Sequence, residues 1–126
     1  MRGYTVSINK CSTELTPREK IKVKDLSNAV KLDTAADASP VEITPSFYVI
    51  LDIHNEKSEN PDYTNLLIVD VDGNKYVTGS PSFMDSFFDI WDEMKEADAN
   101  EVFSIECYKL DSKNYKGKKF LTCSII

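Results

Sequence analysis

Lysines and aromatic residues alternate between residues 108 and 120, near the end of the chain. The lysines are Lys109, Lys113, Lys116, Lys118 and Lys119, and the aromatic residues are Tyr108, Tyr115 and Phe120. Ammonium groups attract the phosphates of a nucleic acid, and aromatic rings stack on bases with little preference among them. This combination favours single strands, whose bases are free to stack. A hairpin kept polar for solubility is an equally weighted alternative.

Two further tyrosines could belong to the same surface. Tyr48 and Tyr76 lie in strand-like runs, where alternation allows both rings to share an outward face with Tyr108. We therefore expect a groove that these three rings line together with Tyr115 and Phe120.

The sequence carries no motif typical of an enzyme or a metal site. The single histidine, His54, ends a strand-like run and has no motif around it. Residues 70–74 begin like a calcium loop but lack its later ligands, so a hairpin turn is expected there. The three cysteines lack the paired spacing of a zinc or redox site, and Cys107 and Cys123 are expected as free core thiols. We expect a protein that is not an enzyme and uses no cofactor.

Charge is distributed unevenly along the chain, whose formal net charge is −6. Residues 43–100 hold three basic residues against twelve acids, whereas residues 1–42 and 101–126 carry net charges of +1 and +2. Nucleic-acid binding must therefore rest on local basic patches and on stacking, because the domain as a whole is not basic.

The elements that must position these side chains are organised around one amphipathic helix at residues 82–97. Its predicted apolar face comprises Phe83, Phe87, Ile90, Trp91 and Met94, and acids occupy most of the other face. Pro81 suits the first turn, and Ser82 with Asp85 resembles a capping box. The acids between residues 85 and 98 indicate a solvated surface, with protein docking or mimicry of nucleic-acid charge as the alternative.

Strands are expected on both sides of this helix. Alternating or continuous apolar character predicts them over residues 3–10, 46–54, 63–71, 75–78, 102–110 and 118–126. A bend is expected at Pro45, a tight hairpin at residues 72–73 and a protruding polar loop at residues 55–62. Residues 18–33 suit a strand as well as a helix, and residues 34–40 have the composition of an exposed loop.

These elements predict a mainly β protein, α+β by content, with a single domain over residues 1–126. Their order is that of an OB-fold-like five-stranded barrel (oligonucleotide/oligosaccharide-binding fold) with one helix between the third and fourth strand groups. An open α+β sheet covered by one helix is the alternative. Because no apolar run is long enough to span a bilayer, we expect no membrane association and a cytoplasmic location.

The second half of the chain resembles single-stranded-DNA-binding proteins of small tailed phages and related mobile elements of Gram-positive bacteria. The resemblance covers roughly residues 64–126 and is most specific in Asp72-Gly-x-x-Tyr76 and Ser112-Lys-x-x-Lys-Gly-x-x-Phe120. It implies an OB barrel that coats single-stranded DNA during phage replication, in the host cytoplasm and without sequence preference. By motif position it places Tyr76, Lys113, Lys116, Lys118 and Phe120 near the strand.

We therefore expect a non-enzymatic protein that binds single-stranded DNA, with RNA as an alternative ligand. The candidate site comprises Tyr48, Tyr76, Tyr108, Lys109, Lys113, Tyr115, Lys116, Lys118, Lys119 and Phe120. A second hypothesis is a phage-encoded acidic interaction protein that uses the helix face at residues 85–98 to block a host nucleic-acid enzyme or defence protein. A structural subunit with neither behaviour is the third.

Overall fold

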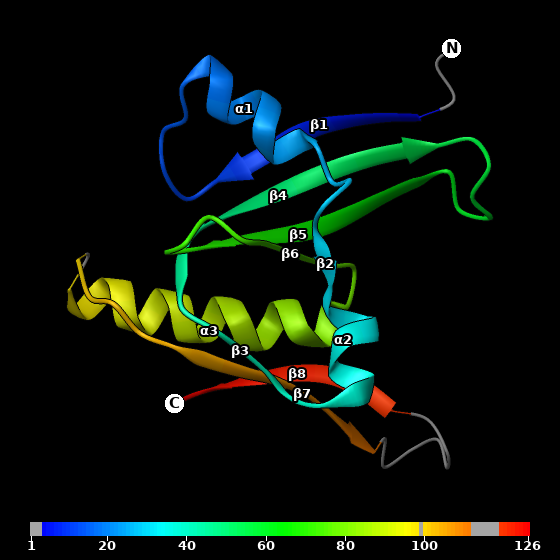
Figure 1. The fold of residues 1–126 in the computed structure, drawn as a ribbon. Coiled ribbons are helices and arrows are strands. Elements are labelled where there is room, and N and C mark those ends of the chain that lie inside the picture. Colours follow the sequence, from blue (N-terminus) through cyan, green and yellow to red (C-terminus); the bar gives the residue numbers. More distant parts are fainter. Residues whose placement is uncertain (1–3, 99, 112–118) are drawn as a thin grey trace.

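The computed structural model describes residues 4–98, 100–111 and 119–126 (Figure 1). The strands are β1 (Tyr4–Cys11), β2 (Val30–Lys31), β3 (Val41–Ile43), β4 (Pro45–Asn55), β5 (Asp62–Asp70), β6 (Lys75–Thr78), β7 (Ile105–Asp111) and β8 (Lys119–Ile125). The helices are α1 (Pro17–Lys24), α2 (Leu32–Ala38) and α3 (Pro81–Ala97). Strand residues outnumber helical ones, which confirms the prediction of a mainly β protein.

The strands form two sheets, which are joined where the chain bends between β3 and β4. β4 pairs with β1 and β5 in a sheet of order β1-β4-β5-β6-β2, whereas β3 pairs with β7 in a sheet of order β3-β7-β8. Only Thr44 separates β3 from β4, where the predicted bend occurs. Its carbonyl accepts a hydrogen bond from the Val71 backbone at 3.0 Å, and its hydroxyl lies 2.6 Å from that of Ser104. Antiparallel ladders therefore run continuously through β6, β5, β4/β3, β7 and β8.

The predicted closed barrel is not found in the part of the chain that the structure describes. No ladder joins β6 to β8 among these residues, and β6 instead pairs in parallel with the two-residue strand β2. α3 lies beside β8, where the Ser82 hydroxyl donates to the Leu121 carbonyl at 2.8 Å. The side chain of Ser86 also meets that of Thr122 at 2.9 Å. α3 therefore packs along β8, the strand that would pair with β6 in a closed barrel.

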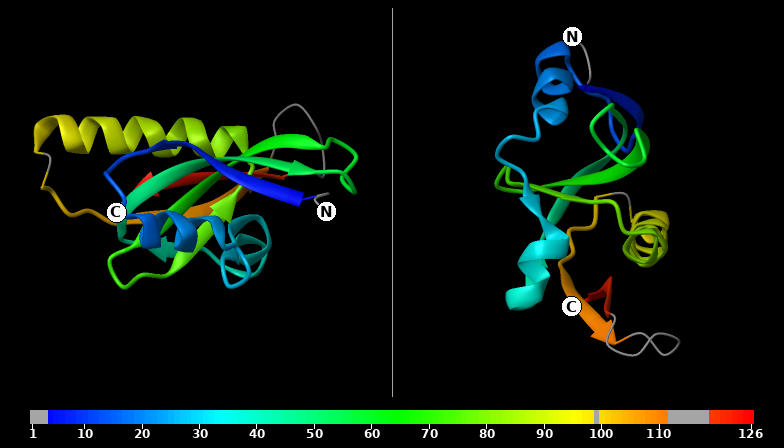
Figure 2. Two further views of the ribbon diagram at one scale, coloured as in Figure 1. Left: turned by 90° about the horizontal axis from the view of Figure 1, so that it is seen from above. Right: turned by 90° about the vertical axis from the view of Figure 1, so that its right-hand side faces the viewer.

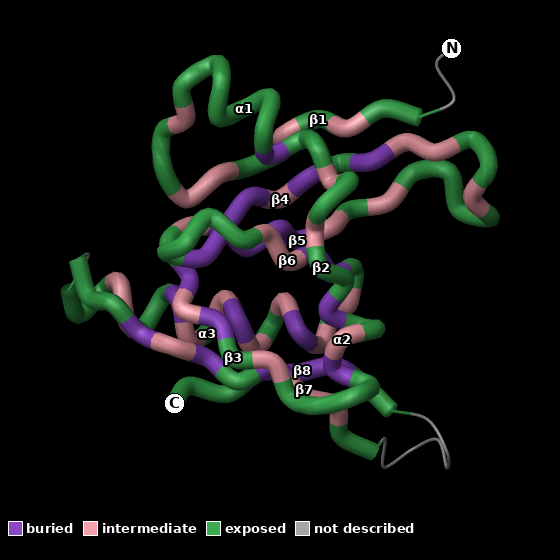
Figure 3. Tube along the Cα trace, viewed as in Figure 1, coloured by how far each residue is buried: buried purple, intermediate pink, exposed green. Residues whose placement is uncertain are grey.

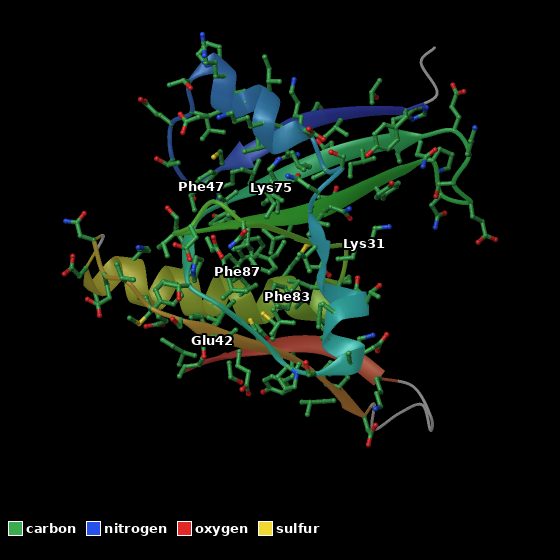
Figure 4. All side chains as sticks on the ribbon, in the orientation of Figure 1. Lys31, Glu42, Phe47, Lys75, Phe83 and Phe87 are labelled. Carbon is green, nitrogen blue, oxygen red and sulfur yellow. The ribbon has the colours of Figure 1, made fainter. Side chains whose placement is uncertain are left out.

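The first core fills the space between the two sheets and α3. Phe83 and Phe87, which are fully buried, point from α3 into this space (Figure 4). The helix begins one residue earlier than the sequence predicts, because the hydroxyl of Ser80 rather than Ser82 caps it and accepts from the Phe83 backbone at 3.3 Å. The thiols Cys107 and Cys123 are free and buried in this core, as predicted.

The second core lies on the other face of the five-stranded sheet, beneath α1. β4 and β5 are therefore buried on both faces along much of their length (Figure 3). α1 contributes the buried side chain of Val23. A capping box between Thr16 and Glu19 starts this helix, which resolves the first part of the ambiguous segment 18–33. Residues 34–40 were expected to be a loop, but most of them belong to α2, because Leu32 and Ala36 pack into the first core.

The hairpin between β5 and β6 has the turn that the sequence predicts. One oxygen of Asp70 accepts from the Asp72 and Asn74 backbone at 2.9 and 2.8 Å, and the other accepts from the Asn74 side chain at 3.1 Å. Gly73 has a φ of +87°, a conformation that favours glycine. Among the described residues, no helix has the length and apolar character needed to cross a membrane.

Candidate nucleic-acid interface

The structure describes six of the ten residues predicted for the site. Lys113, Tyr115, Lys116 and Lys118 lie outside the described residues. Tyr48 was predicted to face outward, and this is wrong because α3 packs against that side of β4. Its ring is only 5% exposed and lies 5.2 Å from the Trp91 ring and 5.7 Å from the Phe87 ring, edge to face. Tyr48 is a core residue and cannot stack on a base.

Two other predicted residues are engaged within the protein. Tyr76 is half-buried against the first core, and its hydroxyl donates to Asp70 at 3.5 Å. Partial burial and the neighbouring carboxylates of Asp70 and Asp72 raise the pKa of Tyr76. The ammonium of Lys109 lies 2.7 Å from the carboxylate of Asp37 on α2, which neutralises its charge. The Tyr76 hydroxyl and the Lys109 ammonium are thus both engaged within the protein.

The three remaining predicted residues lie toward the end of the β7–β8 hairpin at which Asp111 pairs with Lys119. Leu110 pairs directly with Phe120, and Tyr108 lies two residues before Leu110, so these three side chains share one face of the sheet. Phe120 is 37% exposed, Lys119 is exposed, and the Tyr108 hydroxyl lies 2.6 Å from that of Ser124. The structure thus brings together Tyr108, Lys119 and Phe120 but separates them from Tyr48 and Tyr76.

Rings and lysines also converge in a second place, which the sequence did not reveal. A groove of about 610 Å³ lies on the α1 side of the five-stranded sheet, toward the tip of the β4–β5 hairpin. We call it the tyrosine groove. The polar and aromatic residues that line it include Tyr4, Lys24, Lys31, Asn55, Tyr63 and Asn65.

Strand register places the two tyrosines on the same face of the sheet, on either side of β4. Tyr63 pairs with Ile53, which in turn pairs with Val6, and Tyr4 lies two residues before Val6 on the same face. Tyr4 is 49% exposed and Tyr63 is half-buried. Partial burial and the neighbouring Tyr63 both raise the pKa of Tyr4. The groove therefore presents two neutral phenol rings, one from β1 and one from β5.

The lysines of the groove lie at the two ends of the segment that leads from α1 to the end of β2. We call residues 25–31 the strap. Lys24 ends α1 directly before the strap, and Lys31, which Figure 4 labels, ends both the strap and β2. Both side chains are exposed, and neither has an ion-pair partner within the described ranges. Two ammonium groups are thus available beside the two rings.

One carboxylate also lines the groove. An oxygen of Asp25 accepts hydrogen bonds from the Ser27 hydroxyl at 2.7 Å and from the Ser27 backbone at 3.0 Å. These hydrogen bonds lower the pKa of Asp25, so it stays ionised at neutral pH. Its charge offsets part of the positive charge of the groove.

Five exposed acids lie on α3, on the opposite side of the five-stranded sheet from the groove. α1 carries four basic residues and one acid, and it covers one face of the five-stranded sheet. α3 covers the other face, as Figure 2 shows from two directions. The exposed acids of α3 are Asp85, Asp89, Asp92, Glu93 and Glu96. The sheet therefore separates most of these carboxylates from the tyrosine groove.

A polar face lies on the reverse side of the same β1–β4–β5 extension. The His54 ring Nδ1 lies 2.7 Å from the Asp62 carboxylate, and Asp52 accepts from Asn9 at 2.9 Å and from Thr64 at 3.2 Å. These side chains bond to one another, and the described residues contain no cluster of three side chains suited to a metal ion.

Sequence signals for the groove existed but were weaker than the lysine-rich run. Tyr4 opens the first alternating strand, and Tyr63 opens the most apolar strand directly after a polar loop. A ring at the start of a strand often lies where the core ends. What the sequence did not show is that α1 would bring Lys24 to the same face.

The comparisons with known proteins add no family to this description. The chain matches no protein-family model, and neither a curated protein nor a solved structure is detectably similar to it.

Proposed function

We propose that this protein binds single-stranded nucleic acid through the tyrosine groove, without catalysing a reaction. The observation that carries this proposal is that Tyr4 and Tyr63 line one groove with Lys24 and Lys31, whose ammonium groups have no ion-pair partner among the described residues. Stacking contributes about 1–3 kcal/mol per base, and lysines attract phosphates. Two rings and two cations therefore suit a short stretch of a flexible strand whose bases are unpaired. Single-stranded DNA is the first ligand to test, with RNA next.

The strand order supports an OB-type architecture as part of the proposal. β3 and β4 together correspond to the first strand of an OB fold, and β5 and β6 follow as the second and third. α3 comes next, and the β7–β8 hairpin then pairs with β3. In OB folds the second and third strands and the adjoining loops bind oligonucleotides. The tyrosine groove lies over the corresponding strands, since β5 contributes Tyr63 and Asn65 and β6 contributes Val77. β1, α1 and the strap have no counterpart among the five strands and one helix of an OB fold, and they contribute further residues that line the groove.

Few phosphates would be neutralised, so the affinity should be modest and its salt dependence shallow. Each phosphate contact to a single strand contributes about 0.7 to the slope of log K against log salt. Two lysines predict a slope of about −1.4. A strongly basic single-strand-binding surface would give a much steeper dependence.

Fluorescence anisotropy with a labelled oligo-dT of about 12 nucleotides tests the proposal, in about 50 mM salt. We expect wild-type protein to bind this strand and to bind a duplex of equal length far more weakly. The variant Tyr4→Leu/Tyr63→Leu should lose at least about 30-fold in affinity, because two stacks at about 1 kcal/mol or more each are removed. Absence of binding at tens of micromolar protein would refute the function.

A matched control distinguishes the tyrosine groove from the β7–β8 face. The variant Tyr108→Leu/Phe120→Leu removes two rings from the outer face of that hairpin, and Leu110 remains beside them. We expect it to bind oligo-dT as wild type does. Loss of binding in this variant, with normal binding by the groove variant, would move the site to the β7–β8 face.

A second candidate function rests on the exposed acids of α3. Asp85, Asp89 and Asp92 are exposed and have no ion-pair partner among the described residues. Such a row can dock on a basic protein surface or resemble nucleic-acid charge. This function predicts that the wild-type protein captures a stoichiometric protein partner from a lysate, even after nuclease treatment. The triple variant Asp85→Asn/Asp89→Asn/Asp92→Asn should not capture that partner. The same substitutions should leave oligo-dT binding intact.

A further inference from the structure

The start of the strap is tied to β6 by Lys75, a lysine that does not line the tyrosine groove. We infer that Lys75 is a positioning residue, which holds the strap so that Lys24 and Lys31 face a bound strand. The inference rests on the proposed function, because it concerns the same groove. Lys75 would then affect the affinity for a single strand without contacting that strand itself.

The contacts of Lys75 join β6 to the end of α1. Its ammonium donates to the carbonyl of Lys22 at 2.5 Å and to the carbonyl of Asp25 at 2.7 Å. The last carbonyls of a helix lack partners within the helix, and a cation there also interacts favourably with the helix dipole. Lys75 therefore satisfies the exposed end of α1 from a neighbouring strand (Figure 4).

The other end of the strap is held by the same strand. Val30 pairs with Tyr76 and Lys31 with Val77 in the short parallel ladder between β2 and β6. Between these two ends, Leu26 and Ala29 pack on the second core. Three consecutive residues of β6 thus fix both ends of the strap. They also fix the separation of Lys24 and Lys31, which stand at those ends.

This arrangement gives Lys75 and the groove lysines different roles. The ammonium of Lys75 is bound by two carbonyl oxygens, whereas those of Lys24 and Lys31 have no ion-pair partner among the described residues. A lysine that contacts a phosphate contributes to the salt dependence of binding, because binding releases a counterion. A lysine that only positions the strap changes the affinity but not the salt slope.

Oligo-dT titrations at several salt concentrations between about 25 and 200 mM separate the two roles. The variants are Lys75→Met, Lys75→Arg, Lys24→Ala and Lys31→Ala. We expect Lys75→Met to weaken binding about fivefold to tenfold with the wild-type slope, because the fraction of molecules with an ordered strap falls. Lys24→Ala and Lys31→Ala should each make the slope shallower by about 0.7. Lys75→Arg, which keeps the donors, should recover most of the affinity.

Hydrogen exchange supplies a readout that does not depend on binding. Amides of residues 25–31 should exchange faster in Lys75→Met, while those of β4 and β5 keep their protection. If Lys75→Met does not fold, Lys75→Gln, which retains an amide donor, should show the same effects at smaller size.

Three results would overturn the inference. Wild-type affinity in Lys75→Met would show that the strap does not need Lys75, and the proposed function would stand. A salt slope reduced in Lys75→Met as in Lys24→Ala would make Lys75 a direct phosphate contact. If wild-type protein binds no single strand at all, the proposed function fails and the inference falls with it.

Discussion

The side-chain oxygen of Asn65 lies 2.8 Å from the position that a Cβ atom on Gly79 would occupy. Asn65 lines the tyrosine groove, and Gly79 directly follows β6. The missing side chain of Gly79 therefore leaves room for the amide of Asn65. This contact links the end of β6 to the floor of the proposed binding site.

Gly79→Ala should disturb the groove more than the fold. The atom in the way is the far end of a flexible side chain, so Asn65 can rotate and the fold should survive. We expect a change of less than about 1 kcal/mol in the free energy of unfolding. Oligo-dT affinity should fall several-fold, because the displaced amide enters the space of the ligand. Urea denaturation and anisotropy measure the two effects.

Gly73→Ala is the matched control for this prediction. Gly73 has a φ of +87° and no atom within 4 Å of an added Cβ, so only backbone strain opposes the substitution. We expect a loss of about 1 kcal/mol in stability and unchanged binding. Equal loss of affinity in both glycine variants would contradict a specific role for the floor of the groove.

Tyr48 and Tyr63 should respond in opposite ways to substitution. Tyr48 is packed among Phe87, Phe88 and Trp91, so Tyr48→Ala should cost about 3 kcal/mol or more of stability. Tyr63→Leu keeps apolar contact with the second core and should change stability by less than about 1 kcal/mol. It should weaken oligo-dT binding by about 1–3 kcal/mol. A Tyr63→Leu protein with wild-type affinity would show that this ring does not stack on a base.

The helix and most strands could be predicted from the sequence because their patterns are local. Phe83, Phe87 and Trp91 recur at helical spacing, and residues of β4 alternate between two faces as expected. Alternation tells which residues share a face, but not what covers that face. The error at Tyr48 arose in this way, since its predicted outward face is the one against which α3 packs.

The tyrosine groove could not be predicted because it depends on contacts between distant segments. Tyr4 and Tyr63 share one face, on either side of β4, only through the register of β1 and β5 on that strand. Lys24 joins them from α1, which starts at a capping box and whose end is hydrogen-bonded by Lys75, 50 residues beyond Asp25. The lysine-rich run drew attention by its composition, yet Lys109 from that run pairs with Asp37.

Thiol accessibility tests the placement of the three cysteines. Burial raises the pKa of Cys123 to about 12 and raises that of Cys107 further, so neither forms a thiolate near neutral pH. Cys11 is only partly buried on β1. A chromogenic disulfide reagent should therefore titrate one thiol in native protein and three in denaturant. Cys11→Ser should leave none reactive, and rapid labelling of Cys107 would contradict the buried position of β7.

The pH dependence of stability should report on the contact between His54 and Asp62. The hydrogen bond to Asp62 raises the pKa of His54 above its ordinary value of 6.5. A raised pKa in the folded state means that protonation favours folding, so this contribution is complete below about pH 6.5 and disappears as the pH rises through the raised pKa. Because His54 is well exposed, solvent weakens the interaction and the effect should be small.

Urea denaturation of wild type and His54→Gln at about pH 5.5 and about pH 8.5 isolates this contribution. We expect the stability difference between the two proteins to be larger at the lower pH, and Asp62→Asn to remove the same dependence. A difference that grows with pH would reverse the sign and contradict the ion pair. Because His54 lies on the face opposite Ile53 and the tyrosine groove, both variants should retain oligo-dT binding at either pH.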